Sequence, residues 1–112
     1  MKIATETGED GVAVAIVKSD EIDASNYDRF KNALVGALDT SKRVVVDLTQ
    51  VRFIDSSGLG ALLAAQHHAA ETGGRFILCG LTPYVKSLFE TVRLDTLFQI
   101  CEDTADALAS FE

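Results

Sequence analysis

Residues 44–61 read VVVDLTQVRFIDSSGLGA, and this stretch decides the expected fold. It opens with Val44–Val46, a continuous apolar run that is typical of a strand buried on both faces. Asp47–Ile54 follow as a turn and a short extended piece, and a helix is predicted from about Ser57 to Thr72. Gly73-Gly74 ends that helix, because glycine accepts the left-handed conformation common at helix C-termini. The stretch therefore predicts a buried strand that leads through a short loop into a helix.

Strands and helices alternate on either side of this unit. Gly8–Gly11 predicts a hairpin turn before a strand at Val12–Lys18. The remaining predicted elements are a helix from Ser25 to about Asp39, a strand at Phe76–Cys79, a helix begun by Thr82 and Pro83, a strand at Phe98–Cys101 and a terminal helix at Thr104–Phe111. Crossover connections of this length predict an α/β fold. We expect one domain over residues 1–112, with a mixed sheet of about five strands and about four helices packed on it.

The spacing of apolar residues and caps predicts how the helices sit. Ser25-Asn26-Tyr27-Asp28 is similar to a capping box, with aspartate in place of the preferred glutamate. In the helix at 57–72, helical periodicity predicts the inward-facing residues to be Leu59, Leu62, Leu63, Gln66 and Ala70.

Charge and composition limit the possible partners. The 112 residues carry 17 acidic and 10 basic side chains, a net charge of −7. Such a surface is repelled by DNA and by anionic membranes, so a role in transcription would have to act through a protein partner. Neither a signal peptide nor a transmembrane run is found, and we expect a cytoplasmic protein. Cys79 and Cys101 form no disulfide framework and no metal-ligand spacing, and are expected to be reduced, buried side chains.

The junction between the buried strand and the following helix is unusual. Phe53–Ala61 place two serines and two glycines in one helical turn, at the carboxyl end of a strand, where open α/β sheets bind ligands. A glycine inside a helix costs about 1 kcal/mol relative to alanine, so close approach by another backbone is one reason to find it there. Asp55, Ser56 and Ser57 are also good helix caps, so a purely structural interpretation stays open.

Enzymatic interpretations of the sequence are weaker. The junction lacks the Gly-x-Ser-x-Gly nucleophile elbow. Gly58-x-Gly60 lacks the third glycine of a dinucleotide loop, and no phosphate-binding loop is present. His67 and His68 are adjacent in a helix, so they point in different directions and are expected on a solvated surface. We therefore expect no catalytic activity, no metal and no cofactor.

The stretch 45–60 strongly resembles anti-sigma factor antagonists, single-domain proteins of the STAS family, which also includes sulphate transporter tails. Further segments similar to landmarks of that family are Glu21-Ile22-Asp23, Gly73-Gly74, Leu81-Thr82-Pro83-Tyr84-Val85 and Leu88-Phe89. At two positions, Asp20 and Arg93, the family commonly has glycine instead.

The resemblance implies a switch in bacterial transcription regulation. The unphosphorylated antagonist would bind an anti-sigma factor that is also a serine kinase, and so free a sigma factor. That kinase would phosphorylate the serine directly after the aspartate, here Ser56, and end binding; a phosphatase would reset the switch. Of the two serines, we expect Ser56 to point outward and Ser57 to cap or enter the helix. The partner-binding residues implied are Glu21, Asp23, Asp55, Ser56, Ser57, Gly58, Leu59 and Gly60.

Two other functions stay open at this point. One is a STAS interaction subunit of another system, such as a lipid-transport ATPase complex, without obligatory phosphorylation. The other is an enzyme, which a nucleotide-hydrolysis assay on the isolated chain would reveal.

Overall fold

The first two strands form a β-hairpin in the computed structural model, which describes residues 1–112. β1 (Lys2–Thr7) pairs antiparallel with β2 (Val12–Lys18). Gly11 in the connecting turn has φ 82°, a left-handed value that glycine adopts without the penalty of a Cβ. The Asp10 carboxylate accepts a hydrogen bond from the Val12 N–H at 3.1 Å. The predicted hairpin is confirmed.

Three parallel strands complete the main sheet. They are β4 (Arg43–Asp47), β6 (Arg75–Cys79) and β7 (Gln99–Cys101). The strand order is β1-β2-β4-β6-β7, and only β1 is antiparallel to its neighbour. Val44, Val45 and Val46 in the central strand are all fully buried, as their continuous apolar run predicts. The expected mixed sheet of five strands is confirmed, with β1 and β7 at its edges.

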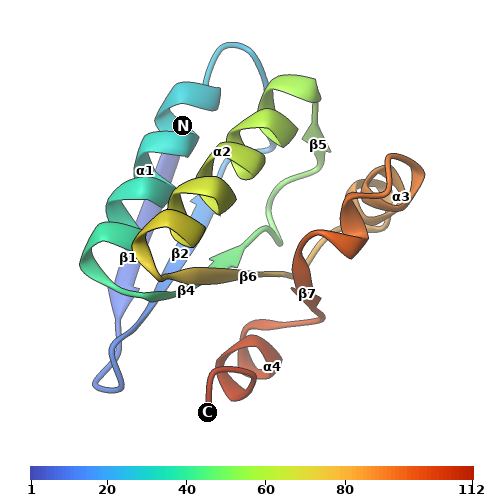
Figure 1. The fold of residues 1–112 in the computed structure, drawn as a ribbon. Helices are drawn as coiled ribbons and strands as arrows, with labels where there is room; N and C mark the ends of the chain where they lie inside the picture. The colour runs from blue at the N-terminus through green and yellow to red at the C-terminus, as the bar shows by residue number, and fades with distance from the viewer.

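Helices cover the two faces of this sheet unequally. They are α1 (Tyr27–Thr40), α2 (Ser56–Thr72), α3 (Pro83–Thr91) and α4 (Thr104–Ala109). The first three share a core with Val44 and Val46, whereas α4 packs with Val45. Because successive strand residues point to opposite faces, α4 lies alone on the second face. Figure 1 shows α1 and α2 side by side over the strands and α4 near the C-terminus. None of the four helices is both long and apolar enough to cross a lipid bilayer.

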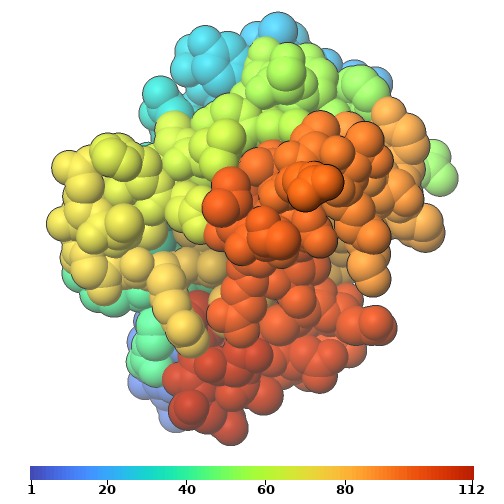
Figure 2. Space-filling view, turned by 45° about the vertical axis from the view of Figure 1, so that its right-hand side comes forward, coloured from blue at the N-terminus to red at the C-terminus, as the bar shows by residue number.

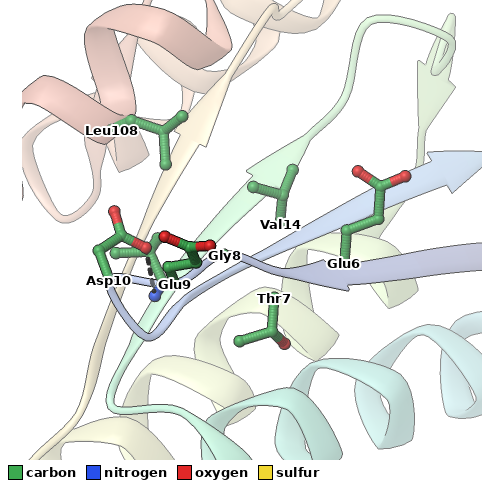
Figure 3. Close-up of a pocket in the computed structure, with 8 residues that line it drawn as sticks. Glu6, Thr7, Gly8, Glu9, Asp10, Val14 and Leu108 are labelled. Atoms are coloured by element: carbon green, nitrogen blue, oxygen red, sulfur yellow. Dashed lines mark hydrogen bonds between the residues drawn. The ribbon is translucent and has the colours of Figure 1, made fainter.

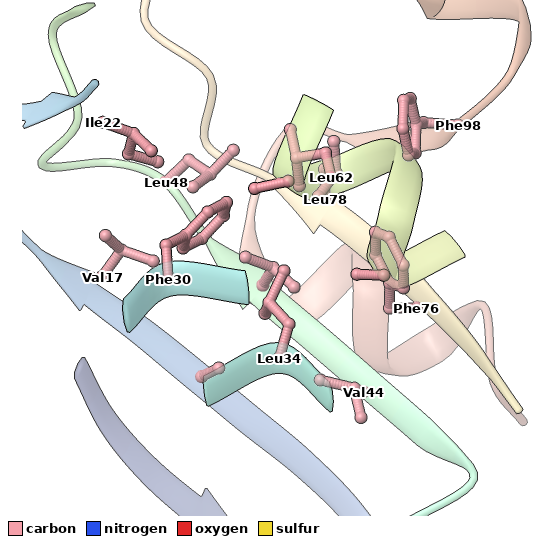
Figure 4. Packing of buried hydrophobic residues seen from close by; sticks show 14 of the residues in the cluster. Val17, Ile22, Phe30, Leu34, Val44, Leu48, Leu62, Phe76, Leu78 and Phe98 are labelled. Atoms are coloured by element: carbon pink, nitrogen blue, oxygen red, sulfur yellow. The ribbon is translucent and has the colours of Figure 1, made fainter. Parts of the chain in front are cut away.

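The larger core fixes α1 and α2 on the sheet. Phe30 and Leu34 of α1 gather with Leu62 of α2 and Leu78 of β6 (Figure 4), and all four side chains are at most 1% exposed. Burying a side chain of this size contributes about 1.5–3 kcal/mol. This packing determines where the N-terminus of α2 lies.

A second, very small sheet connects the loops at the carboxyl end of the main sheet. β3 (Glu21–Ile22) and β5 (Phe53–Ile54) pair in parallel, with Glu21 opposite Phe53 and Ile22 opposite Ile54. Both isoleucines are buried. The short extended piece predicted before the second helix is therefore β5, whereas the sequence did not predict β3.

The helix termini confirm some predicted caps and correct one. Gly73 ends α2 with φ 77°, and the Thr82 hydroxyl accepts a hydrogen bond from the Val85 N–H at 3.4 Å at the start of α3. The predicted capping by Ser25 is wrong, because α1 begins after Asn26 and the Ser25 hydroxyl donates to Asp23 instead. The Ser25 hydroxyl is bonded to Asp23 and is therefore not available to cap the helix.

The buried face of α2 differs from the predicted one. Leu62 is buried as expected, but Leu63 is 39% exposed. The other buried residues of α2 are small, namely Gly58, Ala61, Ala65 and Ala69. Small residues let α2 approach its neighbours closely, so the inward stripe follows alanines rather than the largest apolar side chains. Ala70, also predicted to face inward, is exposed, so the buried stripe is offset by one residue from the predicted one.

The chain after α3 contains a strained residue. Arg93 has φ 62° and precedes the 3₁₀ turn η1 (Leu94–Thr96). A non-glycine residue in this left-handed region costs roughly 1–2 kcal/mol. This is one of the two positions where the resembled family commonly has glycine, a residue that adopts a positive φ without this cost.

Candidate functional site

The predicted site residues come from two segments that the small sheet brings together. The Asp55 N–H donates to the Ile22 carbonyl at 3.1 Å, extending the β3–β5 pairing by one residue. The segment after β3, which carries Asp23, therefore lies beside the start of α2, which carries Ser56. Glu21 and Phe53 are opposite one another on the outer side, because their neighbours Ile22 and Ile54 point into the core.

Asp55 caps α2, and Ser57 enters the helix, which is one of the two placements expected for it. The Asp55 carboxylate accepts a hydrogen bond from the Gly58 N–H at 3.1 Å. Ser56 is the first helical residue and is exposed, and Ser57 is the second and is half-buried. Neither serine hydroxyl takes part in the side-chain hydrogen bonds of the structure, and Ser57 caps nothing. Since Asp55 already satisfies the helix end, both serines are free of that task.

The two glycines of the junction have different environments. A Cβ added at Gly58 would lie 2.6 Å from Ile54 Cγ2 and 2.9 Å from the Ile22 carbonyl oxygen. Gly58 is therefore required for close packing of α2 on β3, and it is buried rather than available to a partner. A Cβ added at Gly60 would meet no atom within 4 Å, and this residue is exposed. Only Gly58 has a reason within the chain for being glycine.

The acidic side chains at the site form no ion pair within the chain. The pKa of Glu21 is raised above its ordinary value, because its protonated form can donate a hydrogen bond to Asp23 and because the Asp23 charge disfavours a second charge. The pKa of Asp23 is lowered, first by the hydrogen bonds from the Ser25 hydroxyl and N–H. The three ion pairs of the chain involve neither of these carboxylates nor Asp55. These carboxylates therefore add negative charge to the surface beside the start of α2.

An exposed aromatic pair lies beside the acids, and sequence reasoning missed it. Phe53 is 41% exposed and Tyr84 of α3 is 56% exposed. Their ring centroids are 6.1 Å apart with the planes inclined by 31°. Strand alternation was the available signal, because a buried Ile54 places Phe53 on the opposite, outer side. Phe53 thus adds an apolar area to the same surface as Glu21.

The histidines do not build a metal site. His67 is exposed and lies 2.7 Å from Glu71, whereas His68 is half-buried and lies 2.8 Å from Asp39 at the end of α1. His67 lies on a solvated surface as predicted. His68 instead contacts Asp39 and so links α2 to α1. No group of three or more His, Cys, Asp and Glu side chains is arranged to hold a metal ion.

A separate depression lies at the opposite end of the sheet. It has a volume of about 540 Å³ and sits between the hairpin turn and Leu108 of α4 (Figure 3). Its rim carries Glu6, Glu9 and Asp10, and it contains none of the predicted site residues. None of the three depressions in the structure is lined by a predicted site residue.

Comparisons with known proteins agree with the geometry. The family model for the STAS domain matches residues 3–107. The anti-sigma-B factor antagonist of Listeria monocytogenes is 31% identical over 102 residues, covering 89% of this chain and 90% of the relative. A solved anti-sigma factor antagonist from Mycobacterium paratuberculosis is 26% identical with a TM-score of 0.84, covering 97% of this chain and 92% of its own.

The fold is also shared with a protein solved in two covalent states. The anti-sigma factor antagonist SpoIIAA in its unphosphorylated form has a TM-score of 0.78 at 19% identity, covering 98% of this chain and 96% of its own. The phosphorylated form of the Bacillus protein SpoIIAA has a TM-score of 0.72 at 18% identity, covering 99% and 100%. With the family model matching nearly the whole length, this chain belongs to the STAS domain family.

Proposed function

We propose that this chain is a cytoplasmic anti-sigma factor antagonist that phosphorylation of Ser56 switches off. In its unphosphorylated form it binds an anti-sigma factor that is also a serine kinase, and binding releases a sigma factor. The kinase phosphorylates Ser56, the complex dissociates, and a serine phosphatase restores the hydroxyl. The catalyst is the partner, so this chain itself performs no reaction. The named relatives of the family support this proposal.

The observation that carries the proposal is the state of Ser56. It is exposed at the first position of α2, and Asp55 rather than Ser56 caps the helix. A phosphate at this position meets the unpaired N–H groups and the positive end of the helix dipole, which stabilise negative charge. The fold can therefore accept the phosphate, and the modification changes the surface rather than the structure.

The surroundings of Ser56 explain how a phosphate would end binding. It adds about −1.5 to −2 charges next to Asp55 and Asp23, which form no ion pair within the chain. A partner that fits this acidic surface would meet a larger, more strongly hydrated group at its centre. Gly60 lies one turn further along α2, exposed and with free space around it. We propose that the partner backbone approaches the helix at Gly60, where a side chain would keep it away.

Calorimetric titration against a kinase-type anti-sigma factor from the same organism tests the proposal. We expect Ser56→Ala to bind like the parent, and the phosphorylated protein and Ser56→Asp to bind more weakly. Ser87→Asp is the control, because it adds the same charge at an exposed position of α3. Equal affinities for the parent and the phosphorylated protein would refute the switch. Capture of a transporter ATPase subunit, with no affinity for the anti-sigma factor, would favour the other STAS function.

A further inference from the structure

A cleft outside the proposed switch lies along the free edge of the main sheet. It has a volume of about 970 Å³ and runs between α3 and β7. Leu81, Phe98 and Ile100 form its apolar part. Figure 2 shows this side of the molecule, with α3 beside α2 and above the C-terminal segment. The candidate residues for the switch do not line it.

The edge strand presents hydrogen-bonding groups to this cleft. Gln99 and Cys101 are in register with β6, and the Gly80 N–H donates to the Cys101 carbonyl at 3.3 Å. In a parallel ladder, backbone groups of alternate residues face opposite sides, so the N–H and carbonyl of Ile100 face away from β6. No strand lies beyond β7. An unpaired edge next to a helix is a template for an added strand.

The charge on the rim favours one kind of occupant. Glu90, Asp95 and Glu102 line the cleft together with a single cation, Lys86. None of these four side chains belongs to an ion pair of the chain. The rim thus keeps a net negative charge that is not neutralised internally, in a protein whose net charge is −7.

We propose that this cleft binds an extended basic peptide segment of another protein, which adds to β7 as a sixth strand. The backbone of the segment pairs with Ile100, its apolar side chains cover Phe98 and Ile100, and its cationic side chains meet the rim carboxylates. This second interaction surface acts independently of Ser56, so the protein can hold a second partner in both states of the switch.

The probe for this proposal is the acetylated and amidated peptide Lys-Val-Lys-Val-Lys, titrated into the ¹⁵N-labelled full chain. We expect amide shifts confined to Phe98–Glu102 and the facing side of α3. N-methylation of both valines removes two strand hydrogen-bond donors and should lower affinity roughly thirtyfold. The acidic peptide Glu-Val-Glu-Val-Glu should not bind.

Charge-reversal variants at the two edges of the sheet test whether the peptide binds at β7 rather than at β1. Glu90→Lys combined with Glu102→Lys should weaken binding of the basic peptide roughly tenfold, because both changes replace attraction by repulsion at the rim. The control is Glu6→Lys combined with Glu9→Lys, which makes the same charge change at the opposite edge. Circular dichroism melting confirms that each variant is folded.

Four results would overturn the proposal: equal affinity of the N-methylated peptide, equal loss in the control variant, shifts at β1 instead of β7, or binding of the acidic peptide. Concentration-dependent dimerisation with shifts at β7 would also overturn it, because a second copy would then occupy the edge.

Discussion

Serine hydroxyls at the two ends of the main sheet differ in whether they form hydrogen bonds within the chain. At the hairpin end, the buried hydroxyl of Ser41 contacts the carbonyl oxygens of Gly11 and Arg43, the latter at 2.8 Å, and it accepts from the Arg43 N–H at 3.3 Å. The Arg43 guanidinium donates to the Asp10 carbonyl. At the other end, the hydroxyl of Ser56 is exposed and makes no bond within the chain.

The difference lies in whether a serine hydroxyl is used inside the fold. At the hairpin end, Ser41 and Arg43 bond to backbone carbonyls, although Glu6 and Glu9 there form no ion pair. The end with α2 keeps a free hydroxyl and an exposed helix glycine. It can leave these groups unsatisfied because buried contacts of Gly58, Ile22 and Ile54 hold the helix in place. The following predictions test this division, from the largest expected effect to the smallest.

Substitution of Gly58 should cause the largest loss of stability. In Gly58→Ala, the added methyl group would lie 2.6 Å from Ile54 Cγ2 and 2.9 Å from the Ile22 carbonyl, which is held by the Asp55 N–H. Overpacking of this kind costs about 1–3 kcal/mol, and the backbone contact places this variant near about 3 kcal/mol. Urea unfolding should show a lower midpoint with an unchanged slope. A midpoint at or above that of the parent would contradict close packing here.

Replacement by alanine should lower the free energy of unfolding at Ser41 and leave it almost unchanged at Ser56. Ser41→Ala leaves a carbonyl and an N–H without their buried partner, so we expect a loss of about 2 kcal/mol. Ser56→Ala removes no internal bond and should change the free energy of unfolding by less than about 0.5 kcal/mol. Urea unfolding of both variants side by side provides the measurement. Similar losses for both serines would show that the two ends do not differ.

The exposed helix glycines provide a matched pair with a smaller effect. Gly36 in α1 and Gly60 in α2 both have free space where a Cβ would lie. Each change to alanine should therefore stabilise the protein by about 1 kcal/mol, a shift that thermal melting can resolve. Only Gly60→Ala should also weaken binding to the anti-sigma factor. If both variants bind equally well, Gly60 is not a contact.

Carboxyl titration should show the smallest effect. We expect the midpoint of Glu21 above 4.5 and that of Asp23 below 3.8 in NMR measurements. The contribution of Asp23 to stability is complete above pH 3.8 and is lost as the pH falls through its lowered folded value. That of Glu21 is present below pH 4.5 and is lost as the pH rises through its raised value. Ordinary midpoints for both groups would show that the two carboxylates do not interact.

Features with a strong local cause could be predicted from the sequence. The hairpin turn, the buried Val44–Val46 strand and the Thr82 cap depend on backbone preferences and on patterns within a few residues. The placement of Ser56 next to Asp55 at a helix start followed for the same reason. Glu21 and Asp23 were assigned to the same site only because of the family resemblance, since no local sequence pattern indicates that they belong there.

Features determined by tertiary contacts were missed. β3 is two residues long and exists only because β5 pairs with it, so it leaves no periodic signal. Leu63 points outward because alanines bring α2 close to its neighbours. The exposed pair of Phe53 and Tyr84 joins a strand and a helix that are far apart in sequence. The sequence left open which of Asp55, Ser56 and Ser57 caps α2, because all three are good caps and only the geometry shows that it is Asp55.

The most direct test of the central claim is to locate the phosphate. The purified chain is incubated with ATP and the kinase-type anti-sigma factor, and fragmentation mass spectrometry identifies the modified residue. We predict phosphate on Ser56 alone, none on the Ser56→Ala variant, and none when ATP is added without the partner. Phosphate on Ser57, or incorporation into Ser56→Ala as fast as into the parent, would contradict the assignment of Ser56 as the switch.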